Sequence, residues 1–207
     1  MAGRRSRSAP RGSSDELRAR LAQEAARVMA EGGIEDFGLA KRKAAERLGV
    51  RGLGALPTNA EIQSCLAERL RIFEPDGHPL RVSQLRQLAA DVMLALEPFA
   101  PRLVGAVLAG TVTINSAVEL HVFADAPELV AAALERDGEV LRDCLRRVRL
   151  DADTSVQLPG FSFARAGEQV DVIVFPERAA HQAPLSPVDR KPMRRAGRSA
   201  VLALLGG

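Results

Sequence analysis

The sequence contains no tryptophan and no tyrosine, and aromatic residues make up only 3% of it. Because single-stranded nucleic acids are held largely by stacking on aromatic rings, this shortage argues against a dedicated single-strand-binding surface. The two cysteines, Cys65 and Cys144, stand apart and outside any CxxC spacing, which predicts buried, reduced thiols. The three histidines are too few and too scattered for a zinc motif.

Long hydrophobic runs are also missing. No apolar stretch approaches the roughly 18 residues that a membrane-spanning helix needs, so we expect no membrane partner. The N-terminus is rich in Arg and Ser but has no apolar segment behind it, which argues against a secretory signal. These features favour a cytoplasmic location.

The composition is that of a folded protein, with 46% hydrophobic and 27% charged residues in 207 positions. This length fits one domain with an appendage, or two small units. The net charge is +3, but the basic residues gather at the ends. Residues 1–12 hold four arginines and no acid, and residues 189–198 hold four arginines and one lysine against one aspartate. The N-terminal tail is therefore a candidate contact for nucleic-acid phosphates.

Composition and hydrophobic spacing divide the chain into three parts. Residues 1–12 have the composition of a disordered basic tail. Residues 13–75 contain three amphipathic helical patterns, over 13–32, 35–48 and 58–73. The capping-box pairs Ser13/Glu16 and Thr58/Glu61 predict the N-termini of the first and the third helix. A Pro-Asp-Gly turn at 75–77 separates this helical region from a third part, residues 76–207.

The hydrophobic period changes within residues 76–207. A fourth helical pattern, from Val82 to Phe99, comes first. We then expect strands over 103–109 and 118–123, helices over 125–135 and 139–147, a hairpin of strands 156–163 and 169–175, and a last helix over 193–205. The predicted fold is therefore α/β (α+β), with a helical N-terminal region followed by a small mixed sheet.

Two of the predicted strands each place a carboxylate between apolar residues, Glu119 in 118–123 and Asp171 in 169–175. A charge in such surroundings is costly unless it is paired, hydrogen-bonded or bound to a cation. Because residues i and i+2 of a strand share a face, His121 projects with Glu119, and Asp171 can join them from a neighbouring strand. Acids on adjacent strands are suitable ligands for magnesium, which neutralises phosphate charge in nucleotidyl transfer.

These residues resemble the DNA polymerase β-like nucleotidyltransferase superfamily over about residues 100–176. Gly110-Thr111 is similar to the Gly-Ser turn of that superfamily. The segment Ser116-Ala117-Val118-Glu119-Leu120 is similar to its pair of acids between hydrophobic residues, and Asp171 matches its third acid on a later strand. Residues 40–45 and 184–189 also look like those of small bacterial proteins grouped with the superfamily.

The resemblance implies a nucleotidyltransferase-like domain over residues 76–207 that transfers a nucleotidyl group from an NTP to an unidentified hydroxyl, with magnesium as cofactor. It makes Glu119 and Asp171 the catalytic acids and metal ligands, with Asp171 also the candidate proton acceptor. His121 is a further candidate ligand. A second set is expected to hold phosphate, namely Gly110, Thr111 and Ser116.

Ala117 departs from the superfamily pattern, because an alanine stands where the first acid is expected and cannot ligate a metal. Two functions therefore stay open: an active magnesium-dependent enzyme, or a degenerate module that binds a nucleotide or a protein partner without turnover.

Several simpler roles stay open as well. Glu119 and Asp171 could form ion pairs, Glu119 for instance with Arg102 or Arg149. Asp151 and Asp153 are expected in a solvated turn, although either could replace the missing acid. Two loop residues could line a pocket, Asp189 and Arg190.

Overall fold

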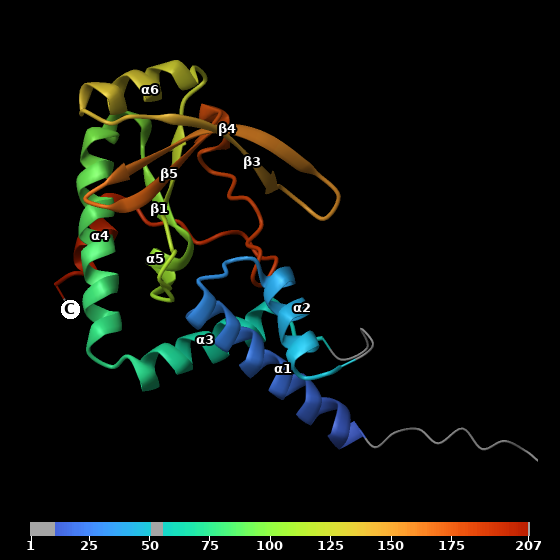
Figure 1. Ribbon diagram of the computed structural model, residues 1–207. Coiled ribbons are helices and arrows are strands. Elements are labelled where there is room, and N and C mark those ends of the chain that lie inside the picture. The colour runs from blue at the N-terminus through green and yellow to red at the C-terminus, as the bar shows by residue number, and fades with distance from the viewer. Residues whose placement is uncertain (1–10, 51–55, 207) are drawn as a thin grey trace, which may run out of the picture.

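Three helices form the N-terminal part of the chain (Figure 1). They are α1 (Arg11–Gly32), α2 (Phe37–Arg47) and α3 (Asn59–Phe73). Apolar residues at helical spacing, among them Leu21 and Ile62, turn to the inside of this trio and form a core of their own. The helical N-terminal region predicted from the sequence is confirmed.

The computed structural model describes residues 11–50 and 56–206, so residues 1–10 of the predicted disordered tail lie outside it. Residues 11 and 12, assigned to that tail, belong to α1 instead. Because α1 begins at Arg11, Ser13 lies within the helix rather than at its predicted start. The predicted capping box of α3 is present: the Thr58 hydroxyl accepts from the Glu61 N–H at 3.2 Å, and the Glu61 carboxylate accepts from the Thr58 N–H at 2.6 Å.

The rest of the described chain builds one five-stranded mixed sheet in the order β1-β2-β5-β4-β3. The β2–β5 pair is parallel, and the other pairs are antiparallel. The elements are, in chain order, α4 (Gly77–Ala95), η1 (Glu97–Phe99), β1 (Arg102–Val104), α5 (Gly105–Ala109), β2 (Val118–Phe123), α6 (Pro127–Arg136), β3 (Arg142–Arg149), β4 (Ser155–Arg165), β5 (Glu168–Phe175), η2 (Glu177–Ala179) and α7 (Arg198–Ala203).

The two faces of the sheet have different neighbours, because side chains alternate along each strand. Leu120 of β2 points to the main core, a cluster of buried residues that also contains Val92 of α4, Val130 of α6 and Val201 of α7. The opposite face, called here the open face, has no such helical layer among residues 11–50 and 56–206. The C-terminal segment 180–196 reaches the edge of the sheet at β1, where Leu103 and Ala196 exchange backbone hydrogen bonds of 2.8 and 3.0 Å.

One predicted strand and one predicted helix are wrong. Residues 103–109 do not form one strand, because Gly105 takes a left-handed conformation (φ +69°) that ends β1 and starts α5. Residues 139–147 do not form a helix. Residues 142–149 pair with β4 as the edge strand β3. Cys144, Arg146 and Val148 share the face that contacts the rest of the sheet, where Cys144 and Val148 pack against apolar residues and Arg146 reaches Asp171.

The final helix is shorter than predicted, covering only Arg198–Ala203, because residue 196 is used to extend the sheet edge. The Ala166-Gly167 turn joins β4 to β5 as expected. Within residues 11–50 and 56–206, no helix combines the length and apolarity that crossing a membrane requires.

We expect Leu120→Ala to lower the free energy of unfolding by about 2–5 kcal/mol, because it leaves a cavity in the main core. The matched control is Leu145→Ala on β3, whose side chain is 70% exposed. Urea denaturation followed by circular dichroism measures both. A loss for Leu145→Ala as large as that for Leu120→Ala would contradict this description of the core.

Candidate functional site

Glu119 and Asp171 are direct neighbours across the parallel β2–β5 pair. Because parallel strands lie roughly 4.8 Å apart, residues in register project side by side from the same face. That face is the open face, the one that also carries His121. The structure thus brings together the two acids that the sequence singled out.

The Asp171 carboxylate is buried and fully engaged. Its Oδ2 accepts a hydrogen bond of 2.6 Å from Arg146 Nη2, which reaches it from β3. Its Oδ1 accepts from the Ser162 hydroxyl at 2.5 Å and from the Gln169 amide at 3.0 Å. Only 6% of the Asp171 side chain is exposed. The negative charge is therefore neutralised by a guanidinium that belongs to the chain itself.

Glu119 is in a different position, because no described side chain donates a hydrogen bond to it. Burial raises the pKa of its carboxyl, the charge of Arg146 lowers it, and the neighbouring acids Glu35 and Asp171 raise it further. The carboxylate packs directly over Gly105, where an added Cβ would lie 2.5 Å from Glu119 Oε2. Arg102 and Arg149, its predicted partners, form no ion pair with it.

Glu35 is a site residue that the sequence did not reveal. It lies in the loop between α1 and α2, just after Gly33, whose carbonyl accepts a hydrogen bond of 3.1 Å from Asn115 Nδ2. This contact ties the helical region to the loop before β2 and brings Glu35 beside Ser116. Desolvation raises the pKa of Glu35, although the residue is exposed to solvent. The Ser116 hydroxyl acts in the opposite direction, and Asp171 raises the pKa further. No motif surrounds Glu35 in the sequence.

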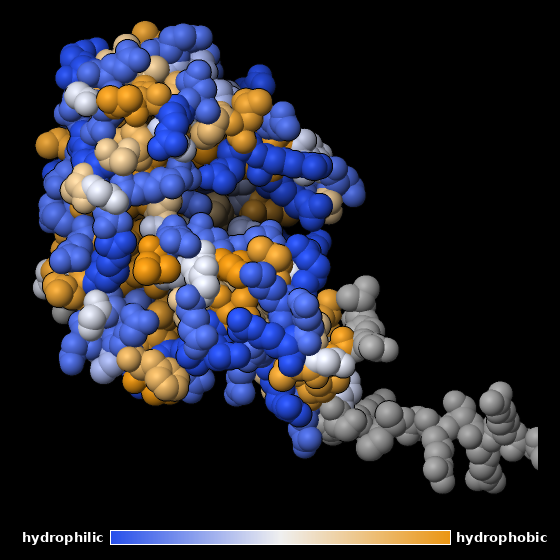
Figure 2. All heavy atoms as spheres, viewed as in Figure 1, coloured by the Kyte–Doolittle hydropathy of each residue, from blue (hydrophilic) through white to orange (hydrophobic). Residues whose placement is uncertain are grey.

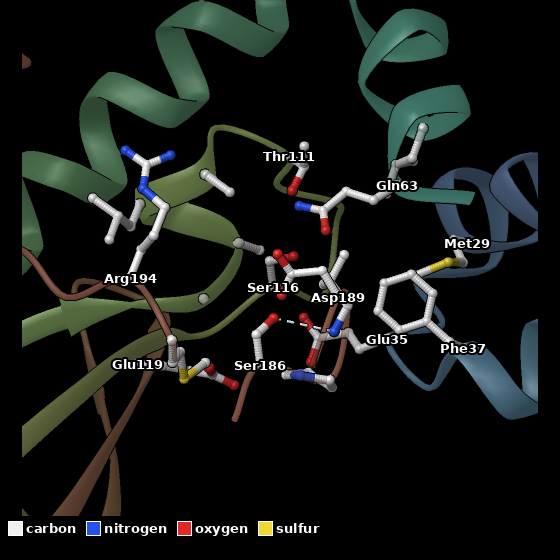
Figure 3. A pocket seen from close by; sticks show the side chains of 18 of the residues that line it. Met29, Glu35, Phe37, Gln63, Thr111, Ser116, Glu119, Ser186, Asp189 and Arg194 are labelled. Carbon is white, nitrogen blue, oxygen red and sulfur yellow. Dashed lines mark hydrogen bonds between the residues drawn. The ribbon is translucent and has the colours of Figure 1, made fainter. Parts of the chain in front are cut away.

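Two cavities meet at Glu119. The first, called here the apolar cavity, has a volume of about 360 Å³ and lies between the N-terminal helices and the β2 side of the sheet. Figure 3 shows side chains from both regions facing each other across it, and Figure 2 shows the hollow in the surface between them. Its lining includes Met29, Glu35, Phe37, Gln63, Ser116 and Glu119.

The second, called here the arginine cavity, has a volume of about 430 Å³. It lies between β3 and the segment 184–193, and His121 and Glu119 also line it. Four arginines and a single carboxylate are among its lining residues; the arginines are Arg146, Arg147, Arg149 and Arg190.

Of the three predicted phosphate-binding residues, two line a cavity and one does not. Thr111 and Ser116 line the apolar cavity, whereas Gly110 only ends α5 in a left-handed conformation (φ +73°). The Thr111 N–H donates to the Ala106 carbonyl at 3.0 Å, and the Ser116 hydroxyl accepts from a neighbouring backbone N–H. The glycine that follows β1 and contacts Glu119 is Gly105, not Gly110.

His121 is held as a neutral ring. Its Nδ1 accepts a hydrogen bond of 3.2 Å from Arg195 Nε, and its ring centroid lies 4.5 Å from that of Phe175. Burial, and then the charge of Arg195, lower the pKa of His121 to about 3.

Of the remaining candidates, Asp151 and Asp153 lie in the exposed β3–β4 turn, where Asp151 Oδ1 accepts backbone N–H groups. Neither lines a cavity at Glu119. Asp189 lines the apolar cavity and Arg190 the arginine cavity.

As arranged here, the strands offer a magnesium ion few free oxygen ligands. Ala117 offers no oxygen ligand, and both oxygens of Asp171 already accept hydrogen bonds, which leaves Glu119 as the free carboxylate on the strands. Over the described parts of the chain, no three His, Cys, Asp or Glu side chains lie close enough to share a metal.

In comparisons with known proteins, no family model and no curated protein matches this chain.

We expect Gly105→Ala to destabilise the fold by roughly 2–4 kcal/mol, because it adds both left-handed strain and a clash with Glu119. The matched control is Gly138→Ala, which has a φ of +91° but no atom within 4 Å of the added Cβ. It should cost only about 1 kcal/mol. Urea unfolding of the two variants tests this. Equal losses would show that Glu119 does not pack against Gly105.

The depressed pKa of His121 predicts a loss of stability in acid. Between its ordinary value of 6.5 and the folded value of about 3, the unfolded chain binds a proton there that the folded chain does not. The free energy of unfolding should therefore fall by about 3 kcal/mol between pH 7 and pH 4 through this residue alone. In His121→Gln the fall should be smaller by that amount, whereas the exposed His181→Gln should follow the wild-type curve. If the free energies of unfolding of the wild-type protein and His121→Gln fell in parallel between pH 7 and pH 4, the predicted contribution of His121 would be refuted.

Proposed function

We propose that this chain is a nucleotide-binding module of nucleotidyltransferase-like architecture that holds its ligand without metal-dependent turnover. The observation that carries the proposal is the contact of 2.6 Å between Arg146 and Asp171. It puts a cation from the chain itself at the acid that the resemblance assigns to magnesium.

The charges around this contact support a binding role. Glu35, Glu119 and Asp171 lie within electrostatic range of one another, and Arg146 lowers the pKa of both glutamates. The guanidinium thus supplies positive charge that a metal would otherwise bring. Ala117 removes a further carboxylate that two-metal catalysis would use.

The apolar cavity supports a nucleotide as the ligand. Met29 and Phe37 provide an apolar wall against which a flat base can pack. Gln63, Thr111 and Ser116 bring amide and hydroxyl groups to the same space, and such groups can recognise the polar edges of a base or a ribose. A largely apolar pocket with a few convergent polar groups is the usual form of a small-molecule site.

A second candidate function is magnesium-dependent nucleotidyl transfer to an unidentified hydroxyl. The register that sets Glu119 beside Asp171 favours it. Arg146 is 47% exposed on the edge strand, so it has room to leave Asp171. This candidate differs from the first in what it requires of Glu119, which would be a metal ligand rather than a nearby negative charge.

Substitution of Glu119 separates the two functions. If Glu119 is only a negative charge beside the ligand, Glu119→Gln should bind ATP or GTP several-fold more tightly in the presence of EDTA, because a repulsion with phosphate is removed. Calorimetry with and without Mg²⁺ measures this, and the exposed Glu128→Gln on α6 is the control. Wild-type binding that requires Mg²⁺ and is lost in Glu119→Gln would favour the enzyme instead. Failure of both nucleotides to bind would exclude the proposal.

A gain-of-function variant adds a second readout. Ala117→Asp restores the i, i+2 acid pair with Glu119, so it should make nucleotide binding more responsive to Mg²⁺. Incorporation of labelled NMP into protein, RNA or small acceptors should be absent from the wild-type protein. Robust wild-type incorporation would contradict a binding role.

A further inference from the structure

We infer that the outer edge of β3 pairs with the same edge of a second copy of this chain, so that two sheets join into one antiparallel sheet around a two-fold axis at Leu145. The partner is a second copy because the edge is complementary to itself, both in charge and in apolar contact. This inference goes beyond the proposed function and does not depend on it.

The outer edge of β3 carries backbone groups that are free to pair. β3 is the last strand of the sheet and pairs with β4 on one side only (Figure 1). The Leu150 N–H donates to the Thr154 carbonyl at 2.9 Å, which places the even-numbered residues of β3 in hydrogen bonds with β4. The odd-numbered ones therefore direct their N–H and C=O groups away from β4. Among residues 11–50 and 56–206, no backbone partner reaches those of Asp143, Leu145 and Arg147.

One end of this edge already holds an extended segment of the chain. The Leu185 N–H donates to the Arg149 carbonyl at 2.7 Å, as expected if the odd-numbered residues of β3 face outward. This contact occupies the C-terminal end of the strand. The stretch around Leu145 is the part of the edge that another strand can join.

A two-fold axis at Leu145 gives a register in which opposite charges meet. Asp143 of one copy lies opposite Arg147 of the second copy, and the symmetry forms this pair twice. The two Leu145 side chains face each other at the axis. Because Leu145 is 70% exposed in the single chain, the pairing covers apolar surface that is otherwise in contact with water.

The same register keeps like charges apart. Two arginines of β3 point to the open face, Arg142 and Arg146, and they lie opposite Val148 and Cys144 of the second copy. A two-fold axis at position 143, 146 or 147 would set a charged side chain against itself, and one at position 144 would set Arg142 against Arg146. The charges of β3 therefore select the register centred on Leu145.

A groove on the other face of the sheet extends the apolar contact. This groove, of about 770 Å³, lies between α6 and the β3–β4 pair, and Leu145 forms part of its wall together with Ala131, Ala132, Pro159 and Phe161. Directly opposed residues of an antiparallel pair project to the same face, so Leu145 of the second copy lies beside this groove. The contact between copies is thus made by side chains as well as by backbone hydrogen bonds.

Charge reversal tests the pairing, with sedimentation equilibrium of the full chain as the measurement. We expect the wild-type protein to dimerise at micromolar concentrations. Asp143→Arg and Arg147→Asp should each weaken the dimer about tenfold, because each variant sets like charges opposite each other. An equal mixture of the two variants should form a heterodimer, and the double variant Asp143→Arg/Arg147→Asp should dimerise like the wild-type protein. The matched control is Arg71→Asp, which reverses an exposed charge on α3 and should leave the dimer unchanged.

A disulfide reports the register. On mild oxidation Leu145→Cys should give a covalent dimer, because the paired Cα atoms lie about 5.5 Å apart, within reach of a disulfide. Leu129→Cys on α6, where the side chain is 60% exposed, is the control and should stay uncrosslinked, as should the wild-type protein with Cys65 and Cys144.

Three results would overturn the inference. The first is a wild-type protein that sediments as a monomer at every concentration. The second is a dimer that the single charge reversals leave intact, or that their mixture fails to restore. The third is crosslinking of Leu129→Cys as readily as Leu145→Cys, because the contact would then not be centred on β3.

Discussion

The ion pair between Arg146 and Asp171 is the interaction on which the open face of the sheet depends. Asp171 lies in the centre of the sheet, where an unpaired carboxylate would be costly, and the nearest cation comes from the edge strand. Satisfying that charge ties β3 across β4 to β5. It also sets the electrostatics of the site, because the same guanidinium lowers the pKa of Glu35 and Glu119. The Arg146 side chain thus stabilises the buried Asp171 and also sets the charge that a ligand would meet at the site.

A second cation, Arg195, packs against the aromatic side chains of this face. Arg195 donates to His121 Nδ1, and its guanidinium carbon lies 5.2 Å and 5.0 Å from the ring centroids of Phe123 and Phe175. Burial lowers its pKa to about 10, so it stays charged at neutral pH. These contacts fix the C-terminal segment over the aromatic part of the sheet. The turn that contains Arg190 is consequently held beside β3.

The helical region reaches the site because Gly33, at the end of α1, adopts a left-handed backbone conformation. Gly33 leaves α1 at a φ of +58°, and an added Cβ there would lie 2.1 Å from Asn115 Nδ2. Only glycine allows the α1–α2 loop to approach the loop before β2 so closely. Asn59 of α3 adds a hydrogen bond of 2.7 Å to the Pro187 carbonyl. The apolar cavity is formed between surfaces that these two contacts bring together.

The sequence by itself determined the α/β class, the three N-terminal helices and the placement of Glu119 and Asp171 on strands, because these follow from local periodicity. It misassigned β3, whose pairing with β4 outweighs a local helical pattern, and 103–109, where one left-handed glycine ends a strand. Only the tertiary structure decided which groups surround the acids. Arg146 and Glu35 reach them from 25 and 136 positions before Asp171, and local patterns carry no information about such long-range contacts.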